Sequence, residues 1–373
     1  MHAAPDAPSE IADRLQRAQH EAVARGLDAL VISTGSDLRY LTGYDAHLTE
    51  RITALVLRAA GEPVLVCPRL EAALATNTAA GQLGVAVEAW DETDNPYVAI
   101  ARIASGARVA LSDRMWAQHV FGLRDAAPQA ELVSAAELMA ALRMVKSTAE
   151  VEALRRAGQA IDAVHAQVPD LLRAGRTEAD VAADLARLIV EAGHVSAAFT
   201  IVGSGPHGAS PHHEYSDRVL QAGDPVVVDI GGPMPDGYES DSTRTYVLGD
   251  PSDEYAEMYA VLHAAHQAAV DVARPGATCA AVDAAARSVI TDAGMGERFI
   301  HRTGHGIGLD GHEHPYLVAG NEQVLAAGMT FSIEPGIYFD GQYGARLEDI
   351  CAVTDGAPQL LNAAPRELVR VEA

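Results

Sequence analysis

Residues 301–315 read HRTGHGIGLDGHEHP, and this stretch carries four of the fifteen histidines of the chain. Imidazole is a frequent metal ligand and a frequent proton carrier, so the spacing of these side chains matters. His301 and His305 are four residues apart, which on a helix would place both on one metal ion. The glycines between and after them disfavour a helix by about 1 kcal/mol each. The segment is therefore expected to be extended or looped, with one histidine binding a metal and the others attending a substrate.

Two acidic residues lie in an apolar hairpin pattern upstream, DPVVVDIGGPMPDGYESDSTRTYVL. The expected strands and turn are Val226–Ile230, Ser240–Leu248 and Pro235–Gly237. Asp229 lies inside the first strand, where an unpaired carboxylate would be costly. Asp241 lies in the returning strand and shares a face with Thr243 because side chains alternate along a strand. The structural alternative is that Asp229 caps the turn before Gly231.

A second hairpin pattern, MTFSIEPGIYFDGQYGARLEDICAVT, also carries one acid on each strand. The expected strands and turn are Met329–Phe339, Ala345–Thr354 and Asp340–Gly341. Glu334 and Glu348 lie mid-strand among apolar neighbours. Two structural alternatives compete with a metal site. Arg346, on the same face as Glu348, would form a solvated ion pair with it, and Glu334 would merely precede Pro335.

An internal repeat relates these two hairpins. Residues 173–193 align without gaps on residues 274–294, an offset of 101 positions (274 against 173). A capping box at Ser147–Glu150 opens a helix expected through Val168, and another helix is expected near 253–273. Alanine-rich helices also resemble one another by chance, but the flanking elements repeat as well. The expected unit is helix, helix, hairpin, occurring twice, with the halves facing each other across a pseudo-two-fold axis.

Four carboxylates would converge if the two halves close face to face. Like charges ~4 Å apart repel by several kcal/mol at intermediate dielectric, so the cluster needs cations. Two divalent ions would balance it, which is the arrangement used by two-metal hydrolases. An oxygen-rich set with one imidazole suits Mn²⁺ or Co²⁺, and is compatible with Zn²⁺ or Fe²⁺.

At this point the sequence resembles a known family, the M24 pita-bread metallopeptidases of the creatinase, aminopeptidase P and prolidase group, which also include methionine aminopeptidase. Five local motifs carry the resemblance from about Ser147 onward: VVVDIGG, SDSTRTY, HRTGHGIGLDGHEHP, FSIEPGIY and RLEDI. The segment DLRYLTGYD resembles the smaller α/β domain of the same family. The resemblance implies an α/β N-terminal domain followed by an α+β pita-bread catalytic domain with an internal pseudo-two-fold repeat.

The resemblance also implies a set of five metal ligands. Asp229 would chelate one ion, Asp241 and Glu348 would bridge both, and His305 with Glu334 would complete the other. Glu334 would in addition act as general base. The ions would lower the pKa of a bound water and polarise the scissile carbonyl.

Further residues acquire substrate roles by the same resemblance. His312 and His212 would stabilise the tetrahedral intermediate through hydrogen bonds, and His301 would lie near the leaving residue. Arg346 would orient a bridging carboxylate. Three other histidines receive no such role: His213, His207, expected on a loop surface, and His314.

The domain division follows from the change in pattern along the chain. Residues 1–10 read as a disordered tail, residues 11–146 as the creatinase-like α/β domain and residues 147–373 as the catalytic domain. Five short apolar runs predict strands in the α/β domain: GLDALVIS, RITALVLR, PVLVCP, VAVEAW and RVALS. The segment GLRDAAPQ, residues 122–129, is expected to be a loop.

The amino-acid composition indicates which binding partners and which cellular location are expected. The net charge of −24 argues against nucleic acid, and the absence of a long apolar run argues against a membrane span. Three widely spaced cysteines (Cys67, Cys279, Cys351) predict no disulfide framework, no thiolate metal site and a cytoplasmic location. Lys146 is the only lysine, so the glycine loop GSGPHG is not expected to bind phosphate.

The catalysed reaction is predicted from the family resemblance. Two domains and HRTGHGIG point to a peptidase that cuts Xaa-Pro bonds in proline-containing peptides, and the compact chain favours a Xaa-Pro dipeptidase (prolidase). The alternatives are a Xaa-Pro aminopeptidase (aminopeptidase P) acting on longer peptides, a non-catalytic pita-bread peptide-binding module, and a dimetal hydrolase of a non-peptide substrate. The resemblance also implies a homodimer.

Overall fold

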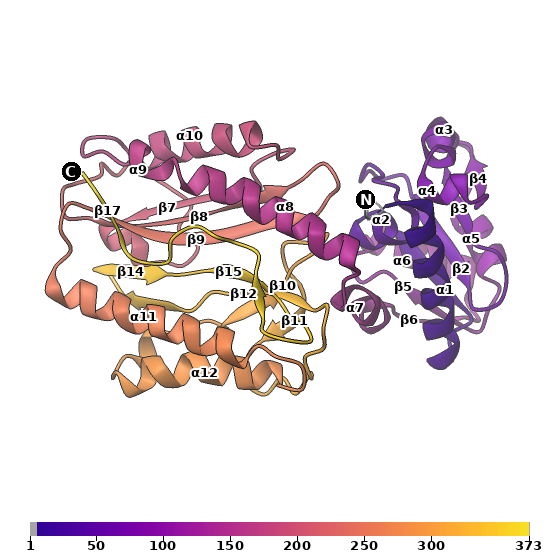
Figure 1. Ribbon diagram of the computed structural model, residues 1–373. Coiled ribbons are helices and arrows are strands. Elements are labelled where there is room, and N and C mark those ends of the chain that lie inside the picture. The colour runs from indigo at the N-terminus through magenta and orange to yellow at the C-terminus, as the bar shows by residue number, and fades with distance from the viewer. Residues whose placement is uncertain (1–5, 373) are drawn as a thin grey trace. The chain divides into compact units, whose positions relative to one another are not determined.

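The computed structural model describes residues 6–372, which divide into two compact units between Arg143 and Met144. The boundary had been expected after residue 146. Figure 1 shows the elements of each unit.

The first unit is an α/β domain, as predicted, built on one mixed six-stranded sheet with the order β4-β3-β2-β1-β5-β6. Strand β1 pairs antiparallel with β2 and parallel with β5. Its elements are α1 (Pro8–Ala24), β1 (Ala29–Ser33), α2 (Ser36–Thr42), β2 (Ala54–Arg58), β3 (Val64–Pro68), η1 (Arg69–Glu71), α3 (Ala72–Thr76), α4 (Ala79–Gln82), β4 (Ala86–Trp90), α5 (Pro96–Ala104), β5 (Arg108–Leu111), α6 (Ala117–Ala126), β6 (Glu131–Ser134) and α7 (Ala136–Met144).

Two predictions for this unit were wrong. Pro8 begins helix α1, so residues 8–10 are not a disordered tail, while residues 1–5 lie outside the described residues. Proline suits the first turn of a helix because its missing N–H would have no partner there. Helix α6 continues to Ala126 across most of the expected 122–129 loop, because His119 and Leu123 bury one of its faces and outweigh the cost of Gly122.

The second unit contains the elements of both repeats. They are α8 (Thr148–His165), α9 (Val168–Leu171), α10 (Glu178–Glu191), β7 (Phe199–Ser204), η2 (Gly205–Ala209), β8 (Pro225–Pro233), β9 (Glu239–Leu248), α11 (Asp253–Val272), α12 (Cys279–Asp292), η3 (Gly296–Arg298), β10 (Gly304–Gly306), β11 (Glu313–Leu317), β12 (Thr330–Ile333), β13 (Gly336–Phe339), β14 (Tyr343–Arg346), β15 (Asp349–Ala352), β16 (Gln359–Leu360) and β17 (Val369–Val371).

The two repeats have matching helices. The expected capping box is present at the start of α8, where Ser147 and Glu150 exchange hydrogen bonds. Helices α10 and α12 start at positions offset by the repeat length and are capped by the equivalent Thr177 and Thr278. In Figure 1, α8 and α10 cover one side of the strands of this unit and α11 and α12 cover the other. The four helices therefore enclose the two hairpins, with one hydrophobic core under each pair of helices.

The two hairpins differ in their course. Strands β8 and β9 pair without interruption from Pro225 to Pro233, in a four-stranded sheet of order β17-β9-β8-β7. The second hairpin, expected as two long strands, is broken on both sides. Strands β12 and β15 belong to a five-stranded sheet, whereas β13 and β14 form a separate two-stranded sheet. Pro335 has no N–H to continue the ladder, so Glu334 and Glu348 lie at the break and not in mid-strand.

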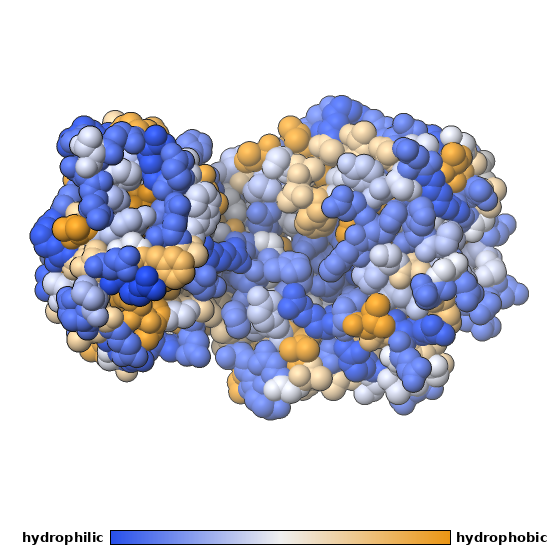
Figure 2. Space-filling model, turned by 180° about the vertical axis from the view of Figure 1, so that it is seen from behind, coloured by the Kyte–Doolittle hydropathy of each residue, from blue (hydrophilic) through white to orange (hydrophobic). Residues whose placement is uncertain are grey.

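The only lysine of the chain is buried in this unit. The Lys146 side chain is 1% exposed, and its Nζ lies 2.7 Å from Oε1 of Glu313. The three cysteines are buried free thiols. On the face drawn in Figure 2, hydrophobic residues lie in small groups among hydrophilic ones. Among the described residues, every helix is too short or too polar to cross a membrane.

Candidate metal centre

The first hairpin presents its acids on one face of the sheet. Asp229 lies directly opposite Thr243, and Gly231 lies opposite Asp241. Because side chains alternate along each strand, Asp229, Asp241 and Thr243 share a face. Strand β7 adds Ile201 opposite Asp229, on the same face. The β8–β9 pairing therefore presents two carboxylates and a hydroxyl together.

His305 enters the same space from the short strand β10. Its flanking glycines allow β10 to lie close to its neighbours: a Cβ at Gly304 would overlap the carbonyl oxygen of Ser332, and one at Gly306 would overlap that of His314. The expected extended conformation is therefore confirmed, and close strand packing is its physical reason. Nδ1 of His305 donates to the carbonyl of Gly306 (3.2 Å), which leaves Nε2 facing the acids.

A cavity of about 350 Å³ gathers every predicted site residue. Its size is at the lower end of the ~300–1,000 Å³ range of small-molecule pockets. The predicted residues that line it are Asp229, Asp241, His305, Glu334, Glu348, His212, His301, His312 and Arg346. The structure thus brings together side chains from both halves of the repeat, although it assigns none of them a role.

The donor atoms fall into three overlapping groups, one of which joins Asp241, His305 and His312. Ligand atoms of Asp229, Asp241 and Glu348 lie within 4.8 Å of one another, and so do those of His305, Glu334 and Glu348. Nε2 of His305 is 3.1 Å from Oε1 of Glu334 and 3.7 Å from Oδ2 of Asp241. Two triads that share Glu348 are the arrangement expected for two adjacent ions.

The charges in the cavity are poorly balanced. Burial, followed by the charges of neighbouring carboxylates, raises the pKa of Glu348 and Asp241 well above their ordinary values. Asp229 has a raised pKa for the same main reason, with Arg346 opposing the shift. Burial alone would raise the pKa of Glu334, but its hydrogen bond and charge interaction with His305 outweigh burial and lower the pKa to about 2. The protein alone therefore does not stabilise all four acids in their ionised form.

The residues fit a pair of divalent ions. Oδ1 of Asp229 is buried and accepts no hydrogen bond from the described residues, so it has a lone pair available for an ion. Thr243 donates to Oε2 of Glu348 (2.7 Å), and Ser332 donates to Oε1 of Glu334 (3.0 Å). Such hydrogen bonds orient carboxylate ligands. The donor set, four carboxylates and one imidazole, suits hard to intermediate divalent cations.

Arg346 makes different contacts from those considered in the sequence. Its Nη2 donates to Oδ2 of Asp229 (2.5 Å), and its Nε donates to Thr243 Oγ1 (3.1 Å), which in turn donates to Glu348. Arg346 and Glu348 are both buried, so a solvated ion pair between them is excluded. Arg346 therefore contacts Asp229 directly and Glu348 only through Thr243, for which no role was predicted from the sequence.

Two histidines on the cavity wall have identifiable hydrogen-bond partners. Nη2 of Arg302 lies 3.2 Å from Nδ1 of His312, and because arginine can only donate, Nδ1 accepts and Nε2 carries the proton. Burial and the nearby His305 lower the pKa of His312 to about 4, so it is neutral at pH 7. His301 contacts the hydroxyl of Tyr338 through Nε2 (2.9 Å), and burial lowers its pKa. Neutral His312 therefore carries its N–H hydrogen-bond donor on Nε2.

Several residues that line the cavity were not predicted from the sequence. Phe199, Ile201, Pro211, Glu214 and Arg302 also line the cavity. The strand register could have indicated the first two, because β7 pairs with β8. Arg302 follows His301 directly but carries no spacing signal of its own.

The three histidines without a predicted role separate into two kinds. His314 is exposed, beside the ring of Tyr316. His207 and His213 instead both contact the buried carboxylate of Glu178. The expectation that His207 is merely loop surface was therefore wrong. The contact spans about thirty residues of sequence, and local pattern does not show it.

Comparison with known proteins identifies the family. Residues 152–355 match "Metallopeptidase family M24", and residues 14–145 match the "Creatinase/Prolidase N-terminal domain". The chain is 53% identical over 362 residues to a Mycobacterium tuberculosis protein named "Probable dipeptidase PepE", with 96% of each chain covered. This chain belongs to metallopeptidase family M24.

Two further M24 relatives agree. The "Xaa-Pro dipeptidase" of Lactobacillus delbrueckii subsp. lactis is 36% identical, covering 92% of this chain and 94% of that protein. The crystal structure of dipeptidase PepE from Mycobacterium ulcerans has a TM-score of 0.94 and 55% identity, over 98% of this chain and 99% of that one. The chain is a metallopeptidase with a creatinase-like N-terminal domain and a pita-bread catalytic domain, and membership of family M24 implies divalent metal ions.

Proposed function

We propose that this metallopeptidase is a Xaa-Pro dipeptidase (prolidase) that works with two divalent ions, Mn²⁺ in the first place and Co²⁺ or Zn²⁺ as alternatives. The observation that carries the proposal is the convergence of the five predicted ligands in one cavity of dipeptide size. Asp229, Asp241 and Glu348 would hold one ion. His305, Glu334 and Glu348 would hold the other, and Asp241 would contact this second ion as well. When bound, the ions lower the pKa of water and polarise a carbonyl group.

The protein side chains supply the proton transfers. Glu334 is ionised at neutral pH and lies among the proposed ligands, so it is placed to accept the proton of the attacking water as general base. The N–H on Nε2 of His312 points from the cavity wall and donates to the oxyanion that forms at the scissile carbonyl, with His212 as a second donor. His301, held by Tyr338, lies at the leaving residue. Arg346 acts as a positioning residue through Asp229 and Thr243.

The cavity wall favours a proline dipeptide. Phe199, Ile201 and Pro211 provide an apolar surface for a pyrrolidine ring. Two arginines line the cavity. Arg346 is hydrogen-bonded to Asp229, whereas the guanidinium of Arg302 lies over the ring of Tyr316 (4.4 Å) beside His312. A guanidinium at this place can bind the free C-terminal carboxylate that a dipeptide has beside the scissile bond. An aminopeptidase P substrate continues beyond proline and has no charge there.

The proposal is tested by comparing Ala-Pro with Ala-Pro-Ala-Ala as substrates, with Mn²⁺ added. A dipeptidase hydrolyses the first and leaves the second nearly intact. Cleavage of the tetrapeptide with little activity on Ala-Pro would favour the aminopeptidase alternative.

Replacing Arg302 by Met tests the carboxylate assignment. Loss of a charged hydrogen bond of about 1.5–3 kcal/mol should raise KM for Ala-Pro roughly 10–100-fold relative to that for Ala-Pro-amide, which has no carboxylate. Any effect through the Arg302–His312 hydrogen bond is common to both substrates and cancels in this ratio. Arg298→Gln is the matched control, because Arg298 lies over the ring of Phe339 and outside the cavity lining. Equal losses on both substrates would remove Arg302 from this role.

Two further expectations accompany the proposal. From the family resemblance we expect a homodimer, which light scattering of the purified protein measures. From the three widely spaced cysteines we expect a cytoplasmic location, which cell fractionation measures.

A further inference from the structure

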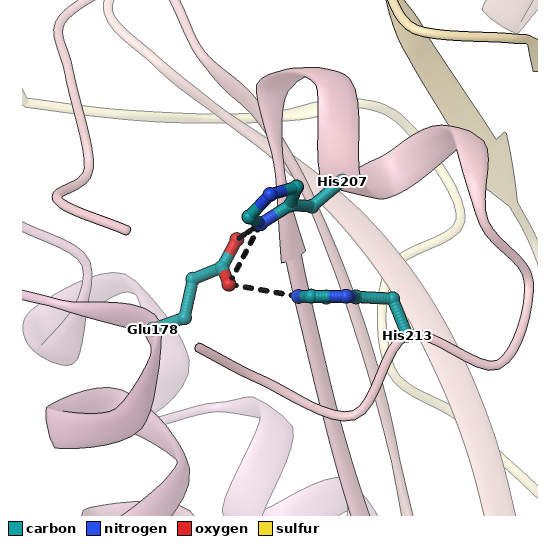
Figure 3. A group of neighbouring side chains, drawn as sticks. All are labelled: Glu178, His207 and His213. Carbon is teal, nitrogen blue, oxygen red and sulfur yellow. Dashed lines mark hydrogen bonds and ion pairs between the residues drawn. The ribbon is translucent and has the colours of Figure 1, made fainter. Parts of the chain in front are cut away.

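A second cluster of metal-binding side chains lies outside the catalytic cavity. Glu178, the first residue of helix α10, extends towards the loop that follows strand β7, where His207 and His213 face it (Figure 3). Nδ1 of His207 is 3.1 Å from both carboxylate oxygens, and Nε2 of His213 is 2.8 Å from Oε2. One donor atom from each of the three residues lies within 4.8 Å of the others. Neither histidine lines the catalytic cavity.

The carboxylate of Glu178 is held in a fixed orientation. Oε1 accepts hydrogen bonds from the backbone N–H and the hydroxyl of Ser204, and Oε2 accepts one from the hydroxyl of Ser216. Burial would raise the pKa of Glu178, but the hydrogen bonds from Ser204, His213 and Ser216 outweigh it and lower the pKa to about 2. The group is therefore a carboxylate at neutral pH, with neighbours that orient it as partners behind a metal ligand do.

The exposure of the three side chains suits an ion that enters from solvent. The Glu178 side chain is 0% exposed, whereas those of His207 and His213 are 36% and 20% exposed. Arg218 interacts electrostatically with Glu178, donates to Ser204 Oγ and is paired with Asp224 through two hydrogen bonds. Its hydrogen-bonded acid is Asp224, whereas the imidazoles of His207 and His213 contact Glu178 directly.

From this geometry we propose that Glu178, His207 and His213 form a separate Zn²⁺ site on the 205–216 loop. Two imidazoles and one carboxylate suit Zn²⁺, with water as a fourth ligand, better than the oxygen-rich catalytic set does. The proton balance is simple. Each neutral imidazole moves its proton from the nitrogen that faces Glu178 to the other ring nitrogen, and an imidazolium releases one proton to solvent.

The site bears on catalysis through the loop. His212, which lines the catalytic cavity, lies between the two proposed zinc ligands in sequence, and the preceding carbonyl of Pro211 accepts a hydrogen bond from Arg346 (3.1 Å). Zinc bound to His207 and His213 would fix this loop at two points on either side of His212. The catalytic proposal does not depend on this site, and the site does not depend on it.

The test counts zinc ions in the full-length chain. Metal-free wild type and H207N are dialysed against the same free Zn²⁺ concentration, and zinc per chain is measured by mass spectrometry. Zinc at the catalytic centre cancels in the comparison, so wild type should retain one ion more than the variant. Loss of one of three ligands should weaken this site by at least the roughly 10–100-fold that an outer-shell partner is worth. H213N should behave in the same way.

Controls separate the site from general effects. Asparagine at 207 can still donate to Glu178, and urea unfolding of the metal-free proteins checks that the fold is kept. H20N removes an exposed histidine of α1 and should leave the zinc count unchanged. Crystals soaked in Zn²⁺ should show an anomalous peak between Glu178, His207 and His213 at the zinc absorption edge. Equal zinc content in wild type and H207N, or a map without that peak, would overturn the proposal.

Discussion

The carboxylates of the catalytic cavity and Glu178 are all buried, yet they differ in what surrounds them. Asp241 and Glu348 face other acids, and burial together with that repulsion raises their pKa values. Glu178 faces serine and imidazole donors, which lower its pKa to about 2 in spite of burial. The partners of a buried acid, and not its depth, thus decide its charge. Bound cations would offset the repulsion among the cavity acids, whereas hydrogen bonds from the protein already stabilise the ionised form of Glu178.

Asp283, in helix α12 of the second repeat, extends this comparison. It accepts hydrogen bonds from the N–H and the hydroxyl of Thr303, just as Glu178 does from Ser204. Its remaining partner is Arg287, through two hydrogen bonds of 2.9 and 3.0 Å. An arginine is a permanent cation and leaves no place for a metal ion, whereas imidazoles can give up a proton and bind one. Glu178 and Asp283 each hydrogen-bond a residue just before a segment that carries site residues. Only Glu178 has partners, the two imidazoles, that can give up a proton and bind a metal ion.

Metal removal should have the largest effect. Two ions, each present at 100 times its dissociation constant, would add about 2.7 kcal/mol apiece to the free energy of unfolding. We therefore expect the metal-free protein to melt well below the Mn²⁺-loaded protein in scanning calorimetry. The measurement is made on H207N, so that only the cavity contributes. An unchanged melting temperature after verified metal removal would contradict the repulsion between the four acids.

Replacing Glu178 by Gln should have the next largest effect, even without metal. The amide cannot accept all of the hydrogen bonds that Ser204, Ser216 and the two imidazoles offer, which should lower the free energy of unfolding by about 2–4 kcal/mol. Urea unfolding of the metal-free proteins measures it. Glu191→Gln, at the exposed end of the same helix, is the control and should change little. A loss as small as that of the control would mean that the hydrogen bonds around Glu178 contribute little.

The effect of His165 on stability should be the smallest near neutral pH and should grow as the pH falls. His165 is a buried imidazole with neutral hydrogen-bond partners in place of a carboxylate. It contacts the hydroxyl of Tyr246 and the carbonyl of Ser242, and burial lowers its pKa to about 3. Below pH 6.5 the unfolded chain binds a proton that the folded chain does not. The free energy of unfolding should therefore fall with decreasing pH between 6.5 and about 3, by up to about 1.4 kcal/mol per pH unit.

The His165→Gln variant should show a shallower fall across that range in urea unfolding at a series of pH values, whereas H20N should follow the wild type. Identical slopes for wild type and His165→Gln would show that this imidazole does not resist protonation.

The sequence was sufficient where a signal is local. The capping box at Ser147 marked the start of α8, and the alternation along β9 placed Asp241 and Thr243 on one face. The glycines beside His305 correctly excluded a helix, although the strand contacts that require them appear only in the structure.

The remainder depends on contacts between distant segments. The break at Glu334 had a local signal in Pro335, but the separation of β12–β15 from β13–β14 into two sheets is a property of the packed fold. The partnership of Arg346 with Asp229 joins the two repeats across more than a hundred residues. Glu178 looked like an ordinary first-turn acid of α10, and only the fold brings His207 and His213 to it.

The buried Lys146–Glu313 pair has a consequence for the surface chemistry of the molecule. With the one lysine 1% exposed, every other basic side chain apart from histidine is an arginine. Reagents and enzymes that acylate, methylate or conjugate lysine ammonium groups meet a chain whose single such target is enclosed. Its exposed arginine side chains stay protonated in strongly alkaline solution.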